Sequence, residues 1–273
     1  METTDGTLLG GRVAYAQPAA GFRSGIEPVL LAAAIPARPG QTVVEAGTGA
    51  GAALLCLAAR VGDVCGVGIE RDPALAALAA ANARANGMDR VHVVVADIAS
   101  LPLRPRMDQA VDHAFANPPY HALGGTPSPL AARRHAKQAS PALFAGWAAA
   151  LAAVLRHRGT VTLILPSAAV PACVAALAAC HCPAEAMLPL WPMTGRPAKL
   201  VLLRGAKGGR SPFRVLPGLV LHRADGAFTL EADAILRDSA ALPMVPSLAR
   251  PAPPAPSPAP REKAGLVAKA TGG

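Results

Sequence analysis

The chain has 273 residues, and its 26 lysines and arginines outnumber its 17 aspartates and glutamates, giving a formal net charge of +9 at pH 7. Hydrophobic residues make up 52% of the sequence and charged residues 16%, which excludes a disordered chain and a solvated coiled coil. With aromatic residues at 3%, the core must be built from alanine, valine and leucine. The positive charge favours a polyanionic partner.

Neither a metal centre nor a membrane segment is expected. The five cysteines include no Cys-x-x-Cys pair, and the adjacent residues 180–182 (Cys-His-Cys) cannot all face one ion. Residues 161–180 are apolar enough to mimic a membrane span, but Pro166 and Pro171 divide them into a buried strand and a helix. The N-terminus lacks the basic and then apolar order of a signal peptide, so we expect a cytoplasmic protein.

The first 40 residues are predicted to be irregular, apart from one helix within residues 28–36 that Pro36 ends. From residue 41 onward, short β-branched runs alternate with longer stretches rich in alanine and leucine. The stretch at 73–85 has helix boundary signals on both sides, with Asp72 before it and Asn86-Gly87 after it. This alternation predicts βαβ units and a parallel sheet covered on both faces.

The alternation continues with strands at 111–120, 160–166 and 199–205 and helices around 140–156 and 168–180. These segments give at least six strands in one α/β domain over residues 41–243. Residues 244–273 are rich in proline and alanine, and we expect them to form a disordered tail.

A glycine-rich turn follows the first predicted strand of this domain: residues 45–51 read Glu-Ala-Gly-Thr-Gly-Ala-Gly and precede the first long helix. Gly47, Gly49 and Gly51 allow a tight turn and leave room for a ligand against the helix N-terminus. The glycine pattern fits a nicotinamide dinucleotide and S-adenosylmethionine equally well.

Acidic residues end the next two predicted strands. Glu70 stands where an acidic side chain binds ribose hydroxyls in either cofactor class. Asp97 can accept a hydrogen bond from an adenine amino group, and Ile98 can cover the ring. Since ligands bind outside the carboxyl ends of such strands, we expect these side chains to form one site.

Asn117-Pro118-Pro119-Tyr120 follows the fourth predicted strand and is the predicted catalytic motif. Prolines there stop the strand ladder, so that backbone carbonyls project into the site. An exocyclic or amide NH2 group is a poor nucleophile because its lone pair is delocalised. Hydrogen bonds from its two protons to the Asn117 side chain and the Pro118 carbonyl would free that lone pair, while Tyr120 stacks on the substrate ring.

Together, these four motifs resemble the class I S-adenosylmethionine-dependent N-methyltransferases. Further segments resemble the bacterial tRNA (adenine-N6)-methyltransferases, which modify the adenine just 3′ of the anticodon in a valine tRNA: residues 6–14, 21–32, 128–136, 199–205 and 216–237. The resemblance covers about residues 5–242. One departure is Glu27, where we expect that family to carry aspartate.

The resemblance implies a Rossmann-like fold with a seven-stranded, mixed, mostly parallel sheet and helices on both faces. It implies transfer of a methyl group from S-adenosylmethionine to an adenine N6 in tRNA, by a monomer that needs no metal. Residues 1–40 would cap the cofactor and substrate. The predicted cofactor contacts are Arg23, Gly25, Glu45, Gly47, Gly49, Gly51, Glu70, Asp97, Ile98 and Asn117. The loop 121–139 would contact RNA through Arg133, Arg134 and Lys137.

Two other enzyme activities fit part of the pattern. Methylation of a glutamine side-chain amide in a translation factor would use the residue 117–120 motif equally well. Enzymes of that kind usually carry a separate N-terminal helical domain, whereas about 40 residues precede the glycine-rich turn here. An NAD-dependent oxidoreductase fits the glycines and Glu70 but leaves Asn117 and Tyr120 without a role.

Overall fold

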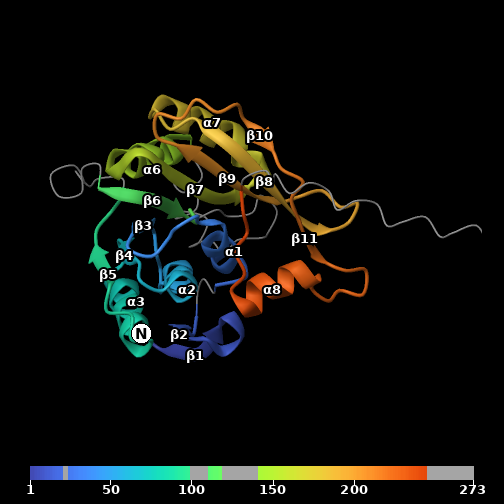
Figure 1. Ribbon diagram of the computed structural model, residues 1–273. Helices are drawn as coiled ribbons and strands as arrows, with labels where there is room; N and C mark the ends of the chain where they lie inside the picture. The colour runs from blue at the N-terminus through green and yellow to red at the C-terminus, as the bar shows by residue number, and fades with distance from the viewer. Residues whose placement is uncertain (21–23, 99–109, 119–140, 245–273) are drawn as a thin grey trace, which may run out of the picture.

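A computed structural model describes residues 1–20, 24–98, 110–118 and 141–244. A twisted sheet forms its centre, with helices on both faces (Figure 1). Its nine described strands are β3 (Thr42–Ala46), β4 (Cys65–Glu70), β5 (Val91–Val95), β6 (Val111–Ala116), β7 (Leu155–Pro166), β8 (Ala184–Met193), β9 (Leu200–Ala206), β10 (Arg214–Val215) and β11 (Leu219–His222).

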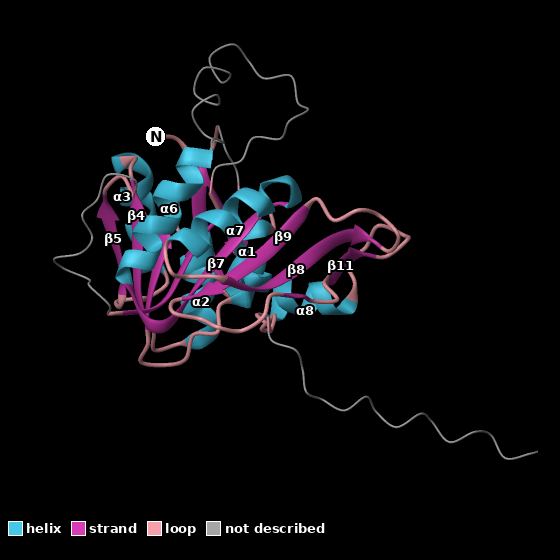
Figure 2. Cartoon of the chain, turned by 90° about the horizontal axis from the view of Figure 1, so that it is seen from above, coloured by secondary structure: helices cyan, strands magenta, loops and turns pink. Residues whose placement is uncertain are grey.

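The strand order is β10-β8-β9-β7-β6-β3-β4-β5, and β11 also pairs with β8. Only β9 runs antiparallel to its neighbours among these strands, which confirms the mixed, mostly parallel sheet. Seen from above, the sheet runs from β5 at one end to β11 at the other (Figure 2).

The expected number of seven strands was too low by two. The additional strands β10 and β11 lie in series along the free edge of β8, where β10 pairs with residues 186–187 and β11 with residues 190–193. Pro217 and Gly218 separate the two strands, and a segment so short and interrupted gives no strand signal in the sequence.

Four described helices cover one face of the sheet: α1 (Glu27–Ala34), α2 (Ala52–Val61), α3 (Pro73–Ala85) and α8 (Leu230–Asp238). Helices α6 (Pro141–Val154) and α7 (Val170–Ala179) cover the other, with the 3-10 turn η2 (Ser167–Ala169) before α7. The helices expected near 73–85, 140–156 and 168–180 are therefore confirmed. Helix α3 begins as expected, since the Asp72 carboxylate accepts from the backbone N–H of Ala74 at 2.8 Å.

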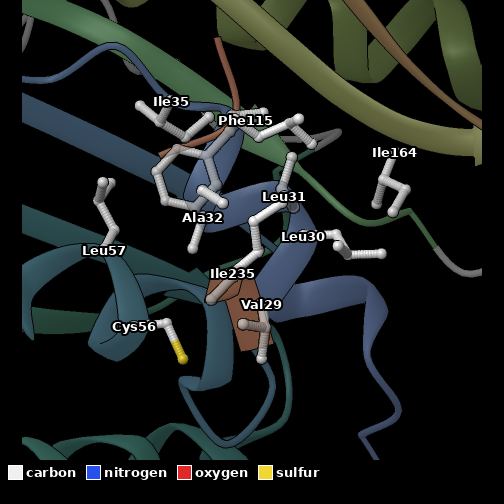
Figure 3. Packing of buried hydrophobic residues seen from close by; sticks show 14 of the residues in the cluster. Val29, Leu30, Leu31, Ala32, Ile35, Cys56, Leu57, Phe115, Ile164 and Ile235 are labelled. Atoms are coloured by element: carbon white, nitrogen blue, oxygen red, sulfur yellow. The ribbon is translucent and has the colours of Figure 1, made fainter. Parts of the chain in front are cut away.

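Because successive side chains of the central strands point to opposite faces of the sheet, the core consists of two hydrophobic clusters, one on each face. Phe115 and Ile164 point toward α1 and α2, whereas their neighbours Ala114, Ala116 and Leu165 belong to the cluster under α6 and α7. Figure 3 shows Phe115 above the α1 residues, with Cys56 and Ile235 on the far side of that helix. Every second residue thus packs on the same face, as a sheet buried on both sides requires.

Two arginines hold the carboxyl end of α1 in this core. Arg60 donates to the carbonyls of Ala32 at 3.1 Å and Ile35 at 2.5 Å, and Arg204 donates to the carbonyl of Ala34. Burial lowers the pKa of Arg204 to about 10. These side chains supply donors to the last carbonyls of α1, where no glycine cap follows; the Ala32 carbonyl also accepts from the Ile35 N–H at 3.3 Å.

The expectation of an irregular segment before α1 was wrong. Strands β1 (Thr3–Leu8) and β2 (Val13–Pro18) form an antiparallel hairpin around the 3-10 turn η1 (Leu9–Gly11). The fully buried side chains of the two strands, Val13 and Tyr15, belong to β2, whereas Leu8 at the end of β1 is partly buried against the core. Since most residues of β1 are small, polar and exposed, its sequence lacks the alternation that marks a half-buried strand.

Residues 161–180 form the buried end of β7, the turn η2 and all of α7, as expected from their two prolines. Within the described ranges, no helix is both long and apolar enough to cross a membrane. Of the predicted tail at 244–273, the structure describes only Met244, which is buried in the core; residues 245–273 lie outside the described residues.

Candidate cofactor and active site

Most of the predicted site residues that the structure describes lie at the carboxyl edge of β3, β4, β5 and β6. Ala46 on β3 pairs with Ile69 on β4 and with Ala116 on β6. The residues that follow this row of paired positions are Gly47, Glu70 and Asn117. Three motifs from distant parts of the sequence are thus neighbours at one edge of the sheet.

The glycine-rich turn adopts the conformation that its composition predicts. Gly47, Gly49 and Gly51 have φ angles of 65°, 57° and 94°, in the region that side chains with a Cβ atom rarely adopt. The backbone N–H of Gly47 donates to the Ile69 carbonyl at 2.8 Å, which anchors the turn to β4. Helix α2 begins directly afterwards, with Gly51 as its N-cap.

Glu70 is fixed beside this turn. One carboxylate oxygen accepts from the backbone N–H of Gly49 at 2.9 Å, and the other accepts from the N–H of Asp72 at 2.9 Å. The residue is 8% exposed. A carboxylate offers about four acceptor sites, so two bonds to the backbone leave capacity for two ligand hydroxyl groups.

Glu45 is directed into the protein. It is 3% exposed and accepts from the Thr48 hydroxyl at 2.6 Å and from the backbone N–H of Leu54 at 3.1 Å. Burial raises its pKa to about 8, against the lowering effect of these two hydrogen bonds, and the nearby charge of Glu70 raises it further. Within the described residues, Glu45 therefore ties the glycine turn to the first turn of α2.

This raised pKa predicts that the free energy of unfolding falls as pH rises from about 4.5 to about 8. Across that window the folded state retains a proton on Glu45 that the unfolded state has lost. The slope from this group is at most about 1.4 kcal/mol per pH unit. Urea denaturation between pH 6.5 and 8 should show the slope, and Glu45→Gln should remove it.

The lower limit of pH 6.5 avoids His113, whose pKa burial lowers to about 4 and which therefore acts in the opposite direction below pH 6.5. An equal pH dependence of the parent and Glu45→Gln between pH 6.5 and 8 would contradict the assignment.

The remaining described site residues follow β5 and β6. Asp97 lies two residues beyond the end of β5, after Ala96, whose N–H donates to the Glu70 carbonyl at 2.8 Å. Ile98 is 4% exposed and belongs to the cluster under α6 and α7. Asn117 is half-buried and Pro118 buried. The other predicted residues lie outside the described ranges: Arg23, Pro119, Tyr120, Arg133, Arg134 and Lys137.

The end of the segment before α1 is held by residues that the sequence analysis did not select. The hydroxyls of Tyr15 and Ser24 share a hydrogen bond of 2.9 Å, and the Ser24 N–H donates to the Gln17 side-chain oxygen at 3.2 Å. Gly25 follows directly and precedes α1. No motif spacing marks Tyr15 or Gln17, because their roles depend on the hairpin that the sequence did not predict.

The geometry at Gly49 tests whether a ligand fits beside Glu70. A Cβ atom added there would meet no described atom within 4 Å, although the same residue's N–H is bonded to the Glu70 carboxylate. Space free of described atoms therefore lies next to the residue whose N–H binds the Glu70 carboxylate, where the sequence analysis expects the ribose of a cofactor. Across the described ranges, no cluster of three His, Cys, Asp or Glu side chains could hold a metal ion.

Gly49→Ala should lower cofactor affinity at least ten-fold, since its methyl group would occupy this space. Gly40 is a matched control, because it also has a positive φ, of 81°, and open space at its Cβ, but it precedes β3 at the opposite edge of the sheet. Both variants should lose about 1–2 kcal/mol of stability. Isothermal titration with S-adenosylhomocysteine tests the difference, and equal affinities in the two variants would contradict it.

Comparisons with known proteins agree with this geometry. Residues 43–139 match the family model described as a methyltransferase domain. A predicted O-methyltransferase from Agrobacterium tumefaciens superposes with a TM-score of 0.65 and 24% identity, over 79% of this chain and 98% of that chain. TrmN from Thermus thermophilus gives a TM-score of 0.50 and 22% identity, over 67% of this chain and 48% of that chain. No curated protein matches the sequence.

The mixed, mostly parallel sheet and the matched segment agree with a Rossmann-like methyltransferase fold. The fold and the family match support S-adenosylmethionine as the cofactor. The two structural relatives have the same fold as this chain, at sequence identities below 25%.

Proposed function

We propose that the protein methylates the N6 amine of an adenine in tRNA, with S-adenosylmethionine as methyl donor. The observation that carries the proposal is the position of Asn117, directly after β6 and next to the glycine turn that follows β3. The group proposed to hold the acceptor amine and the turn proposed to hold the cofactor therefore share one edge of the sheet.

The motif supplies acceptors for both protons of the target amine. The Asn117 side chain has a carbonyl oxygen, and the Pro118 backbone carbonyl lies one residue further along the chain. Hydrogen bonds to these two oxygens hold the amine so that its nitrogen lone pair, otherwise delocalised into the ring, faces the methyl group. Preorganised acceptors of this kind need no rearrangement as charge develops. Tyr120 is proposed to stack on the base after it leaves the helical stack.

The cofactor is proposed to lie across the carboxyl ends of β3, β4 and β5. Glu70 would accept hydrogen bonds from its ribose hydroxyls, and Asp97 would accept one from its adenine amino group, with Ile98 against the ring. The positive φ angles of the glycine turn let the backbone approach the ligand closely. When bound, S-adenosylmethionine supplies the methyl group for transfer.

The RNA backbone is proposed to contact Arg133, Arg134 and Lys137, and the net charge of +9 supports a polyanionic substrate. If these three side chains neutralise phosphates, their combined replacement by alanine should flatten the plot of log affinity for tRNA against log salt. The expected change is about one unit of slope per lost contact. Cofactor affinity should stay constant, and an unchanged slope would assign these residues to the solvated surface.

The proposed function is tested with purified protein, S-adenosylmethionine carrying a labelled methyl group, and three acceptors. These are an unmodified valine tRNA transcript, the same transcript with guanine in place of the adenine 3′ of the anticodon, and a glutamine-containing peptide. Labelling of the first transcript and loss of label in the second support the proposal. Labelling of the peptide with none on either RNA would favour glutamine methylation.

A further inference from the structure

Asn82 on α3 and Asn86, the residue that caps the carboxyl end of this helix, bind the outer edge of the hairpin strand β2. Asn82 accepts from the backbone N–H of Ala16 at 3.0 Å and donates back to the Ala16 carbonyl at 2.8 Å. Asn86, one helical turn later, makes the same pair of bonds with Ala14, both at 2.8 Å. Because a side-chain amide has the donor and acceptor of a peptide group, the two asparagines take the place of a neighbouring strand.

The second amide proton distinguishes the two side chains. Asn82 donates it to the carbonyl of Ala50 in the glycine turn, at 2.9 Å. Asn86 donates it to the carbonyl of Asn82 within the same helix, at 2.8 Å. Both asparagines therefore hold the hairpin on α3, but the contacts of Asn82 also join it to the cofactor turn.

The contacts continue from β2 to the segment that precedes α1. Tyr15 and Gln17, on either side of Ala16, both bond Ser24. The Tyr15 side chain is buried and lies near Glu45 at the base of the turn. Burial raises the pKa of Tyr15, and the charge of Glu45 raises it further. A continuous set of contacts thus runs from Ala50 through Asn82 and β2 to Ser24.

The burial of Asn82 makes this connection rigid. Its side chain is 4% exposed, and both of its donor protons are committed, one to the hairpin and one to the turn. A displacement of either element would leave a buried polar group without a partner, which is unfavourable in a site shielded from water.

We propose that Asn82 is a positioning residue for the cofactor: it holds the β1–β2 hairpin, and through it Ser24, in register with the glycine turn. This inference rests on the proposed function, since it assumes that the turn binds S-adenosylmethionine. Asn82 itself bonds only the protein in the described structure, and it acts by fixing two elements that border the ligand.

Asn86→Ala is a matched control for Asn82→Ala, because each variant loses two hydrogen bonds to β2. The third bond differs: Asn82 loses its bond to the Ala50 carbonyl, whereas Asn86 loses its bond to the Asn82 carbonyl. S-adenosylhomocysteine binding is measured by calorimetry, and thermal unfolding is measured in parallel. We expect affinity to fall at least ten-fold in Asn82→Ala and less than three-fold in Asn86→Ala, with both variants melting below the parent. Equal losses of affinity would overturn the inference while leaving the proposed function intact.

A second measurement uses the unaltered protein and decides the matter if Asn82→Ala does not fold. Amide hydrogen exchange reports separately on the Ala16 N–H, held by Asn82, and on the Ala14 N–H, held by Asn86. S-adenosylhomocysteine should slow exchange at Ala16 more than at Ala14, and equal slowing would overturn the inference. Failure of the parent to bind S-adenosylhomocysteine would instead overturn the proposed cofactor, and this inference with it.

Discussion

Asn117→Ala is expected to lower methyl transfer to tRNA by two or more orders of magnitude while cofactor affinity changes by no more than several-fold. The substitution removes the side-chain oxygen proposed to hold the acceptor amine. Loss of one preorganised hydrogen bond to a reacting group costs about 2.7–4 kcal/mol of transition-state stabilisation. Glu70 and the glycine turn keep their own backbone contacts, none of which involves Asn117.

The measurement is single-turnover transfer of labelled methyl groups to an unmodified transcript, with S-adenosylhomocysteine affinity determined on the same preparations. A slow reaction with unchanged affinity assigns Asn117 to the acceptor amine. Transfer at nearly the parental rate would show that this strand end is structural and that the acceptor is held elsewhere.

Gly47→Ala is expected to have the largest effect on stability among the glycine substitutions in the turn. Its added Cβ would lie 2.8 Å from the ring of Trp147 on α6, and the φ angle of 65° is unfavourable for any residue with a Cβ. The backbone strain and the forced shift of a packed side chain together should reduce the free energy of unfolding by roughly 2–5 kcal/mol.

Gly49→Ala separates these two contributions, because its φ of 57° is similar but its Cβ meets open space. Urea denaturation should therefore give a much lower free energy of unfolding for Gly47→Ala than for Gly49→Ala. Trp147→Leu in the Gly47→Ala background should recover part of the loss by removing the ring, at the cost of some packing. Equal stabilities of the two single variants would contradict the collision with Trp147.

The sequence predicted the elements whose signals are local. The β-branched runs and the alanine-rich stretches with Asp72 and Gly87 at their ends correspond to strands and helices of the structure. The positions of Gly47, Glu70 and Asn117 at one edge followed from the rule that parallel strands end together.

Features that depend on partners far away in the chain were not predictable. Strand β1 is exposed and polar, and β2 is completed by Asn82 and Asn86 on α3 rather than by a third strand. Asn82 lies in an alanine-rich helix and Asn86 caps its carboxyl end, and nothing in the local pattern indicates that either side chain binds β2. The inward direction of Glu45 was equally hidden, because it depends on the fold of the turn around Thr48.

The chemical identity of the product tests the central proposal most directly. Nucleosides from total tRNA of cells with and without the gene can be compared by mass spectrometry, with the Asn117→Ala protein restored to the deletion strain as a control. The proposal predicts that N6-methyladenosine decreases in the deletion strain, returns with the parent protein and does not return with the variant. An unchanged level of N6-methyladenosine in the deletion strain would contradict it.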